Sequence, residues 1–496
     1  MRKVIDVEAQ IKFGQVDISA IRLDFRCRDE IPQLLRGLQF LYGKPQARNE
    51  AFSILEEEVP TKNIRNGRPG MHLWQILVLS VLRVNCNWDW DKIHFMANTH
   101  GLIRQMMGIG EWDEQTFSLQ TIKDNISLLK PETLDKISTL IVREGHNLVK
   151  KKGKNELRGR CDSFVLETNV HYPTDINLLL DAMRKVIFLV AHLCIRAGIP
   201  GWRKYTENFR KIKGLFRQCQ KLKHSTSTDD GKKKERESLI ISAYMIYLDI
   251  ARSFLSRARE TLAEVSASGD EHFLAVLEIE RYITHAERQI DQVERRGVNG
   301  ETIPHDQKVF SIFEEHTEWI SKGKAGVPVE LGLRVCILED QYGFILHHRV
   351  MKGEIDVDVA VPVTENTLRN FPEMTGCSYD KGFWSPENKK KLAEMLPHLV
   401  LPKKGKLSKD DKELEYSDEF IYYRHRHSAV ESGINALENH GLDRCLDHGI
   451  GGFKRYVALA VLGRNLQKLG AVLQAKARKR LKRKKPDSGG GLKKAA

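Results

Sequence analysis

The chain has 496 residues and a formal net charge of +14, from 80 Lys and Arg against 66 Asp and Glu. This length exceeds one ordinary hydrophobic core, so we expect two or three domains, and 41% apolar content suffices to fill them. The charge is uneven: residues 474–496 hold ten Lys and Arg against Asp487, a net of +9, which leaves +5 (14 − 9) for the rest. A body this close to neutral excludes a general polyanion-binding surface, and any nucleic-acid site must be local.

Membrane and metal-thiolate classes are also disfavoured. The N-terminal MRKVIDVEAQ lacks the apolar stretch of a secretory signal, and the most apolar run, 186–195, is too short to cross a bilayer. The eight cysteines form no CxxC pair and have no His at metal spacing, which predicts a reducing compartment and no zinc site. We therefore expect a soluble cytoplasmic protein with no membrane partner.

Residues 1–155 predict a helical domain. Short helices joined by tight turns, as expected on either side of His100-Gly101, are typical of helix-turn-helix units, so we predict that this domain binds DNA. Its tryptophans and the Met106-Met107 pair are interpreted as ordinary helical core. A basic linker over 150–160 is expected to lead into a strand. The expected helices cover 31–43, 72–84, two short segments within 88–110, and an amphipathic segment with Pro131 in its first turn.

Helical periodicity then continues from 175 to about 305, with Asp175 as the expected N-terminal cap and a loop at 224–235. Four long helices, each with one apolar stripe, predict a bundle inserted after the first strand, which we assign to 175–326. Within it, 202–223 carries eight Lys and Arg against Glu207, interleaved with aromatic residues. The aromatic residues form either a core stripe with a solvated basic face or part of a phosphate-binding surface. The candidate DNA contacts here are Arg203, Lys204, Arg210, Lys211 and Lys213.

Strand patterning returns at 327–340, and Tyr342-Gly343 predicts the turn of a hairpin. Helix and strand patterns then alternate, with 403–419 read as a charged loop, until a closing helix ends near 473. The order strand, insertion, hairpin, helix, strand, helix, strand, helix predicts a mixed α/β core built from 160–174 and 327–473 around a mixed sheet. Residues 474–496 are predicted to be a disordered basic tail that contacts DNA.

The predicted sheet and the helix that follows it would bring three acids close together. Asp162 begins the apolar run DSFVLETNV, Asp380 follows a short strand pattern, and Glu431 lies on a predicted helix. Acids at the ends of two strands and on a helix can converge, as remote carboxylates must if they hold a pair of divalent cations. Such a site implies phosphoryl-transfer chemistry. From spacing alone, a solvated strand end, a turn and a solvated helix face are the competing interpretations.

The segments DSFVLETNVHYPTD, YDKGFWSPEN and RHSAVESGINALENHGLDRC resemble the three DDE blocks of bacterial insertion-sequence transposases, closest to the ISNCY-type group. The resemblance covers the core well, the N-terminal third more loosely, and the middle segment hardly at all. It implies an RNase H-like core in which Asp162, Asp380 and Glu431 are the catalytic triad. These three carboxylates would bind two Mg²⁺ ions, for which Mn²⁺ can substitute.

The third acid has a rival in Glu438. Many such transposases share a signature of Tyr, two residues, Arg, three residues, Glu, six residues, Lys. Tyr423 and Arg426 keep the Tyr-to-Arg spacing but lie one residue too far upstream, and Glu438 is two turns along the same helical face as Glu431. Counted from Glu431, the Tyr, Arg and Lys slots hold Arg424, His427 and Glu438. The residues expected near Glu431 to contact DNA phosphate or orient a water are Arg426, His427 and Asn435.

The resemblance implies a DDE transposase that binds the terminal inverted repeats of its element and the target DNA, at least as a dimer. It would cut and rejoin DNA by metal-dependent phosphoryl transfer in the cytoplasm, associated with the nucleoid when bound to DNA. An RNase H-like nuclease without strand transfer is one alternative. The other is a transposase-derived DNA-binding protein without catalysis, which the acid at the Lys slot favours and the intact Asp, Asp, Glu set opposes.

Overall fold

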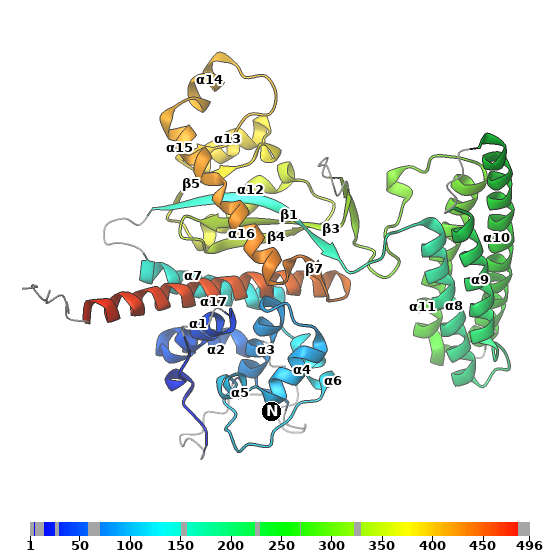
Figure 1. Cartoon of the computed structure of the whole chain (residues 1–496), viewed down its shortest axis with the longest axis horizontal. Coiled ribbons are helices and arrows are strands. Elements are labelled where there is room, and N and C mark those ends of the chain that lie inside the picture. The colour runs from blue at the N-terminus through cyan, green and yellow to red at the C-terminus, as the bar shows by residue number, and fades with distance from the viewer. Residues whose placement is uncertain are drawn as a thin grey trace, which may run out of the picture. The chain divides into compact units, whose positions relative to one another are not determined.

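The computed structural model describes residues 4, 14–24, 29–57, 70–149, 156–223, 229–267, 269–321 and 329–484, the last four of these as backbone only. The chain is a mixed α/β protein, as predicted. It divides into two compact units, one formed by Met1–Asn169 with Ile320–Ala496 and the other by Val170–Trp319. Figure 1 shows the sheet and its helices in the first unit and the helical bundle of the second.

The first unit is built on a mixed sheet that has seven strands in the described part of the chain. Its centre is β1 (Leu157–Thr168), which pairs antiparallel with β3 (Val329–Asp340) and parallel with β5 (Met374–Tyr379). β5 pairs in parallel with β6 (His398–Val400), and β3 pairs antiparallel with β4 (Ile345–Met351). Two short strands complete it, β2 (Glu318–Ser321) beside β3 and β7 (Arg444–Cys445) beside the end of β1.

β1 is longer than predicted. It begins at Leu157, so Asp162 lies in the middle of the strand and not at its start. Arg158 and Arg160 were assigned to a linker because they are basic, but they alternate along β1 with buried apolar positions such as Cys161. That alternation is typical of a strand with one polar and one apolar face. Residues 150–155 lie outside the described part of the chain.

Helices cover both faces of this sheet. α12 (Asp356–Asn370) packs on the apolar face, where the Thr364 and Tyr379 hydroxyls are 2.6 Å apart. α15 (Asp418–His427) contacts β5 and β6, and α16 (Ala429–Leu437) contacts β1. Figure 1 shows α16 lying across β1, and the bond from Arg160 to the Arg426 carbonyl oxygen places this approach on the polar face of the strand. The polar face of β1 is therefore the one that α15 and α16 approach.

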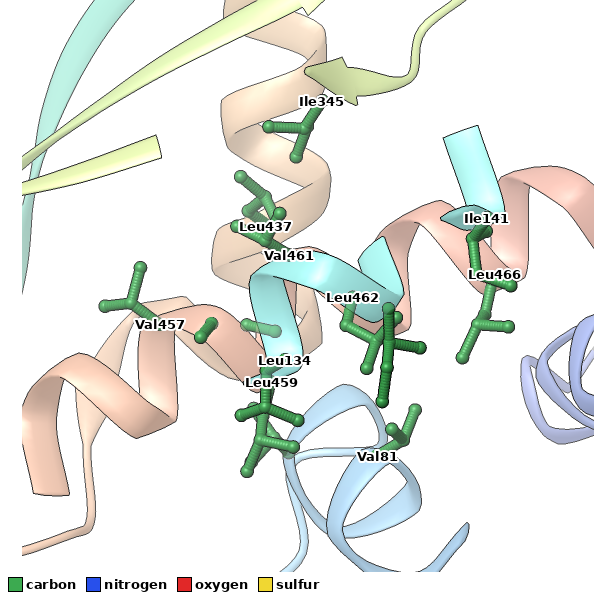
Figure 2. Packing of buried hydrophobic residues seen from close by; sticks show 14 of the residues in the cluster. Val81, Leu134, Ile141, Ile345, Leu437, Val457, Leu459, Val461, Leu462 and Leu466 are labelled. Carbon is green, nitrogen blue, oxygen red and sulfur yellow. The ribbon is translucent and has the colours of Figure 1, made fainter. Parts of the chain in front are cut away.

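The N-terminal helices do not form a separate domain, contrary to the boundary predicted at 155. They share one hydrophobic core with the sheet, because α17 (Gly449–Lys484) packs between them and the strands. In Figure 2, Val81, Leu134 and Ile345 surround apolar residues of α17 such as Leu462. A helix apolar on several sides must be covered on several sides. The remaining helices of this layer are α1 (Ile31–Gly43), α2 (Pro45–Glu56), α3 (Leu73–Asn85), α4 (Trp90–Thr99), α5 (Gly101–Met106), α6 (Leu119–Ile126) and α7 (Pro131–Val149).

Two segments predicted to be irregular are helical. α17 runs on to Lys484, so the first part of the predicted disordered tail is helix, and Gln474 within it is buried. The predicted charged loop at 403–419 contains α14 (Lys409–Glu415). There the Ser408 hydroxyl accepts a hydrogen bond from the Asp411 backbone N–H at 3.1 Å, while the Asp411 side chain accepts one from the Ser408 N–H. This reciprocal cap outweighs the high charge of the segment. Residues 485–496 lie outside the described part.

The second unit is a bundle with its own hydrophobic core. Its helices are α8 (Asp175–Ala197), α9 (Tyr205–Lys223), α10 (Asp230–Ala267) and α11 (Phe273–Val293), and no described residue between 175 and 305 is in a strand. The cap of α8 is Thr174, whose hydroxyl accepts from the Asn177 N–H at 3.3 Å, and not Asp175. The predicted loop at 224–235 is helical from Asp230, and 224–228 are outside the described residues.

Within the described residues, α10 alone is long and apolar enough to cross a membrane, and a third of its apolar window is buried. It packs against α8, α9 and α11. A buried core helix of a bundle meets the same criteria, so this helix by itself does not define a membrane span.

Candidate active site

The register of β1 against β5 brings two of the predicted acids together. The strands are parallel, and Cys161 pairs with Tyr379 as the last described pair of the ladder. Asp162 follows Cys161 within β1, and Asp380 follows Tyr379 directly after the end of β5. Because neighbouring strands lie about 4.8 Å apart, these two carboxylates begin from adjacent backbone positions at the same edge of the pairing. Asp380 follows β5, as predicted, and is exposed.

The pKa of Asp162 depends on three other acids that lie near it. Its pKa is raised to about 6, first by burial and then by the negative charges of Asp380, Asp356 and Glu431. The Ser163 backbone N–H donates to Asp162 Oδ1 at 2.8 Å and opposes the shift. The other two predicted acids, Asp380 and Glu431, therefore lie within electrostatic range of Asp162, together with Asp356, which was not predicted.

The fourth acid, Asp356, is the first residue of α12. The Ser163 hydroxyl donates to Asp356 Oδ1 at 2.6 Å, which ties α12 to the residue that follows Asp162. A Cβ atom on Gly382 would lie 2.8 Å from Asp356 Oδ2, so the loop after Asp380 also passes close to this carboxylate. Sequence reasoning missed Asp356 because acids in a first helical turn are commonly explained by the helix dipole.

Glu431 reaches this region because α16 lies very close to the sheet. A Cβ on Gly433 would be 2.3 Å from Glu339 Oε2, so this turn of the helix passes very close to the end of β3. Val430 and Ile434 form the buried side of α16, while Glu431 is exposed on its first turn. The helix is thus held by its apolar side and presents Glu431 at its edge.

The rival acid, Glu438, lies at the other end of α16, where the chain passes into a π turn (Glu438–Leu442). Seven residues of helix separate it from Glu431, about 10 Å along the axis. Gly441 in that turn packs against the backbone of Val84 in α3, where a Cβ would meet the Val84 carbonyl oxygen at 2.4 Å. The end of α16 that carries Glu438 is therefore anchored to the N-terminal helices, whereas Glu431 is among the charges that act on Asp162.

His427 and Arg160 lie on the same side of the sheet as Asp162. The Ser378 hydroxyl and His427 Nδ1 are 3.0 Å apart, and burial lowers the pKa of His427 although the carboxylates of Asp380 and Glu431 raise it. Arg160 forms an ion pair with Glu339 at 3.0 Å and donates to the Arg426 carbonyl oxygen at 3.5 Å. These contacts join β1, β5 and the junction of α15 with α16. Of the other predicted contact residues, Asn435 is exposed one turn after Glu431.

A cavity of about 1030 Å³ lies on this face of the sheet, and none of the four acids is among its described lining residues. Arg158 and Arg160 line it, and they share the polar face of β1 with Asp162 because side chains alternate along a strand. On its opposite wall, the Arg426 guanidinium lies 4.5 Å from the Tyr422 ring centre. The Arg158 guanidinium lies 4.8 Å from the ring of Tyr423. With Tyr342, the described lining of the cavity combines three arginines and three tyrosine rings with one carboxylate, that of Glu156, a composition suited to a nucleic-acid strand.

The predicted basic stretch in the other unit has its aromatic residues in the bundle core. Trp202 is 2% exposed and donates from Nε1 to the Thr261 hydroxyl at 3.0 Å, and the Phe209 ring lies 5.7 Å from that of Phe188. The core-stripe interpretation is therefore correct for these aromatic side chains. The basic side chains face solvent, namely those of Arg203, Lys204, Arg210, Lys211 and Lys213.

The donor set around Asp162 consists of carboxylate oxygens, which are the ligands that Mg²⁺ and Mn²⁺ prefer. Four neighbouring acids, with one pKa raised partly by the others, form a site whose mutual repulsion a divalent cation would relieve. Among the described residues, no three His, Cys, Asp or Glu side chains are already arranged as a metal-binding group. The residue types around Asp162 fit the predicted metal.

Comparisons with protein-family models, with curated proteins and with solved structures found no match to this chain.

Proposed function

We propose that this chain is a DDE transposase that cleaves and joins DNA strands at the ends of an insertion sequence. The observation that carries the proposal is the position of Asp162. It lies beside Asp380 in the sheet register, and its pKa is raised by the carboxylates of Asp380, Asp356 and Glu431. Acids separated by more than two hundred positions in the sequence thus lie within electrostatic range of Asp162, which a set of unrelated solvated acids would not require.

The strand order supports an RNase H-like core. Along the sheet, β4, β3 and β1 form an antiparallel meander, and β5 and β6 follow in parallel on the other side of β1. This is the order that the resemblance to insertion-sequence transposases implies. The helical unit 170–319 is inserted between the first and second strands of that meander, which leaves the sheet and its acids intact.

Asp162, Asp380 and Glu431 would hold the metal ions, and Asp356 would position the loop around them. Divalent ions bound there would activate a water or a 3′-hydroxyl towards the scissile phosphate and stabilise the leaving oxygen. The side chains of Arg158, Arg160 and Arg426 would bind the phosphates of the strand being cut. His427, held by Ser378, lies where it can accept or donate a proton beside Asp380 and Glu431.

The proposed partners are the terminal inverted repeats and the target DNA, in a complex of at least two copies of the chain. The exposed basic residues of α9 and the basic end of α17 would add phosphate contacts that carry no sequence information. The N-terminal helices α4, α5 and α6 are the proposed source of end recognition. The proposed location is the cytoplasm, in association with the nucleoid.

The test is an end-cleavage assay with the purified full chain, Mg²⁺ and DNA that carries the inverted repeats flanking the element. Asp162→Asn, Asp380→Asn and Glu431→Gln keep shape and remove charge, so each should reduce cleavage by orders of magnitude. Binding of end DNA should survive or improve, since a negative charge near phosphate is removed. Glu438→Gln is the matched control and should retain cleavage.

The products distinguish the alternatives. Joined products support strand transfer, whereas cut but unjoined DNA identifies a nuclease. If Glu438→Gln abolishes cleavage and Glu431→Gln does not, the third acid is Glu438. Binding without cleavage in the wild-type chain, or normal cleavage in all four variants, would refute the catalytic proposal.

A further inference from the structure

The helical unit contains a cavity of its own, of about 660 Å³, whose lining residues all belong to 170–319. It lies where the first turn of α8 meets the end of α11 and the segment around His305 and Phe310. Its volume is in the range of small-molecule sites. The proposed transposase chemistry makes no use of it.

One polar group in the cavity wall lacks a partner. Tyr244 of α10 is 2% exposed, and its hydroxyl forms no hydrogen bond with any described residue. Gly297 holds the ring in place, because a Cβ there would lie 2.6 Å from Tyr244 Cε2. A buried hydroxyl without a partner is uncommon and costs free energy, so it indicates a group that is supplied from outside the chain.

The charges around the cavity favour an anion. Lys223, Arg296 and Lys308 line it, while among the described lining residues Asp175 is the only one with a carboxylate. Asp175 is 3.4 Å from Arg296 and so offsets one of the three cations. The Lys223 ammonium lies 5.2 Å from the ring centre of Tyr244, which places a positive charge beside the ring that carries the unpaired hydroxyl.

The mouth of the cavity also offers flat aromatic surfaces. The Trp319 ring lies 5.6 Å from Phe310 and 5.8 Å from Tyr172, and Tyr172 is 61% exposed. All three rings line the cavity. Stacking on exposed aromatic rings is how proteins hold a planar base, whereas a site for inorganic phosphate alone has no need of them.

We propose that this cavity binds a nucleoside phosphate, with the base on the aromatic rings, the phosphates on Lys223 and Lys308, and the Tyr244 hydroxyl bonded to the ligand. Two sources share this chemistry, a free nucleotide and an unpaired nucleotide at the end of a DNA strand. The proposal concerns a unit that contains none of the predicted acids, and it stands or falls independently of the cleavage reaction.

Binding should be measured by calorimetric titration of the full chain with ATP, GTP, CTP and TTP, and with a short single-stranded oligonucleotide and a blunt duplex. Uridine, which lacks phosphate, and inorganic phosphate are the ligand controls. Tyr244→Phe removes one oxygen from the wall, and Lys308→Gln removes one cation. The matched controls are Tyr205→Phe and Lys234→Gln in α10, which change the same groups outside the cavity.

We expect at least one nucleoside triphosphate or the single strand to bind, with Kd raised roughly tenfold or more by each cavity variant and unchanged by each control. Uridine and inorganic phosphate should bind much more weakly. Variant-sensitive binding of triphosphates identifies a free nucleotide as the source, and variant-sensitive binding of the single strand alone identifies DNA. The proposal is wrong if no ligand binds, or if the cavity variants bind every ligand as the wild type does.

Discussion

Asp356 and Asp358 lie in the same helical turn and have different surroundings. Asp358 Oδ2 accepts a hydrogen bond from the Ile355 backbone N–H at 2.9 Å and so closes the start of α12. Asp356 instead contacts the Ser163 hydroxyl and adds to the negative charge around Asp162. The two acids therefore have different contacts, although either carboxylate would interact equally well with the positive end of the helix dipole.

We expect Asp356→Asn to reduce cleavage of end DNA by about 10- to 100-fold and to raise the Mg²⁺ concentration required for half-maximal rate. The reason is that outer carboxylates orient the groups that bind a metal. The measurement is the cleavage rate against Mg²⁺ concentration. Asp358→Asn removes the same charge and keeps a good capping residue, so it should cleave normally. Equal loss in both variants would mean that only the charge of the helix start matters.

At the scale of elements, α17 organises the first unit because it crosses α1 at close range. A Cβ on Gly37 would lie 2.3 Å from the Leu466 carbonyl oxygen, and one on Gly470 would lie 2.0 Å from the Gln33 carbonyl oxygen. Each helix thus has a glycine at the point where the backbone of the other helix comes closest. Gly214 in α9 of the other unit has no atom within 4 Å of such a Cβ.

Gly37→Ala should lower the free energy of unfolding of the first unit by about 1–3 kcal/mol, since the added methyl group forces the helices apart. Gly214→Ala should raise that of the helical unit by up to about 1 kcal/mol, because alanine is the better helix former. Calorimetry of the full chain measures both. With two separate hydrophobic cores, each substitution should shift a different transition. A single transition moved by both would contradict the division into two units.

At the scale of the whole molecule, the basic end of the chain is partly an extension of the core. Gln474 is buried and α17 continues to Lys484, so a truncation at 474 would remove packed residues together with charge. Removing 481–496 instead takes away six Lys and Arg together with Asp487, a net charge of +5 (6 − 1). This truncation keeps all the residues that are buried in the described structure.

We expect the chain without 481–496 to bind DNA more weakly by a similar factor for every sequence, with a smaller dependence of affinity on salt. Loss of phosphate contacts has this effect because fewer counterions are released on binding. Electrophoretic or fluorescence titrations at several salt concentrations, with end DNA and unrelated DNA, provide the measurement. A changed preference between the two DNAs would show that this segment reads sequence.

Local patterns were sufficient for most of the secondary structure. The helices at 31–43 and from Pro131, the hairpin at Tyr342-Gly343 and the bundle after the first strand follow from periodicity, proline and glycine positions, which are local properties of the chain. The same patterns assigned Arg158 and Arg160 wrongly to a linker. Two arginines in a basic stretch resemble a linker in the sequence, and only the pairing of β1 with a strand on each side shows that they belong to a strand.

Long-range packing determined the rest. Sequence spacing proposed Asp162, Asp380 and Glu431, but only the parallel register of β1 with β5, and the glycine that lets α16 approach the sheet, place them near one another. Asp356 and the cavity around Tyr244 had no sequence signal, since each depends on residues that are far apart in the chain. The N-terminal helices were predicted as a domain because their apolar stripes are self-evident in the sequence. Their partner α17 lies more than three hundred residues later, and burial of its apolar sides merges them into one core.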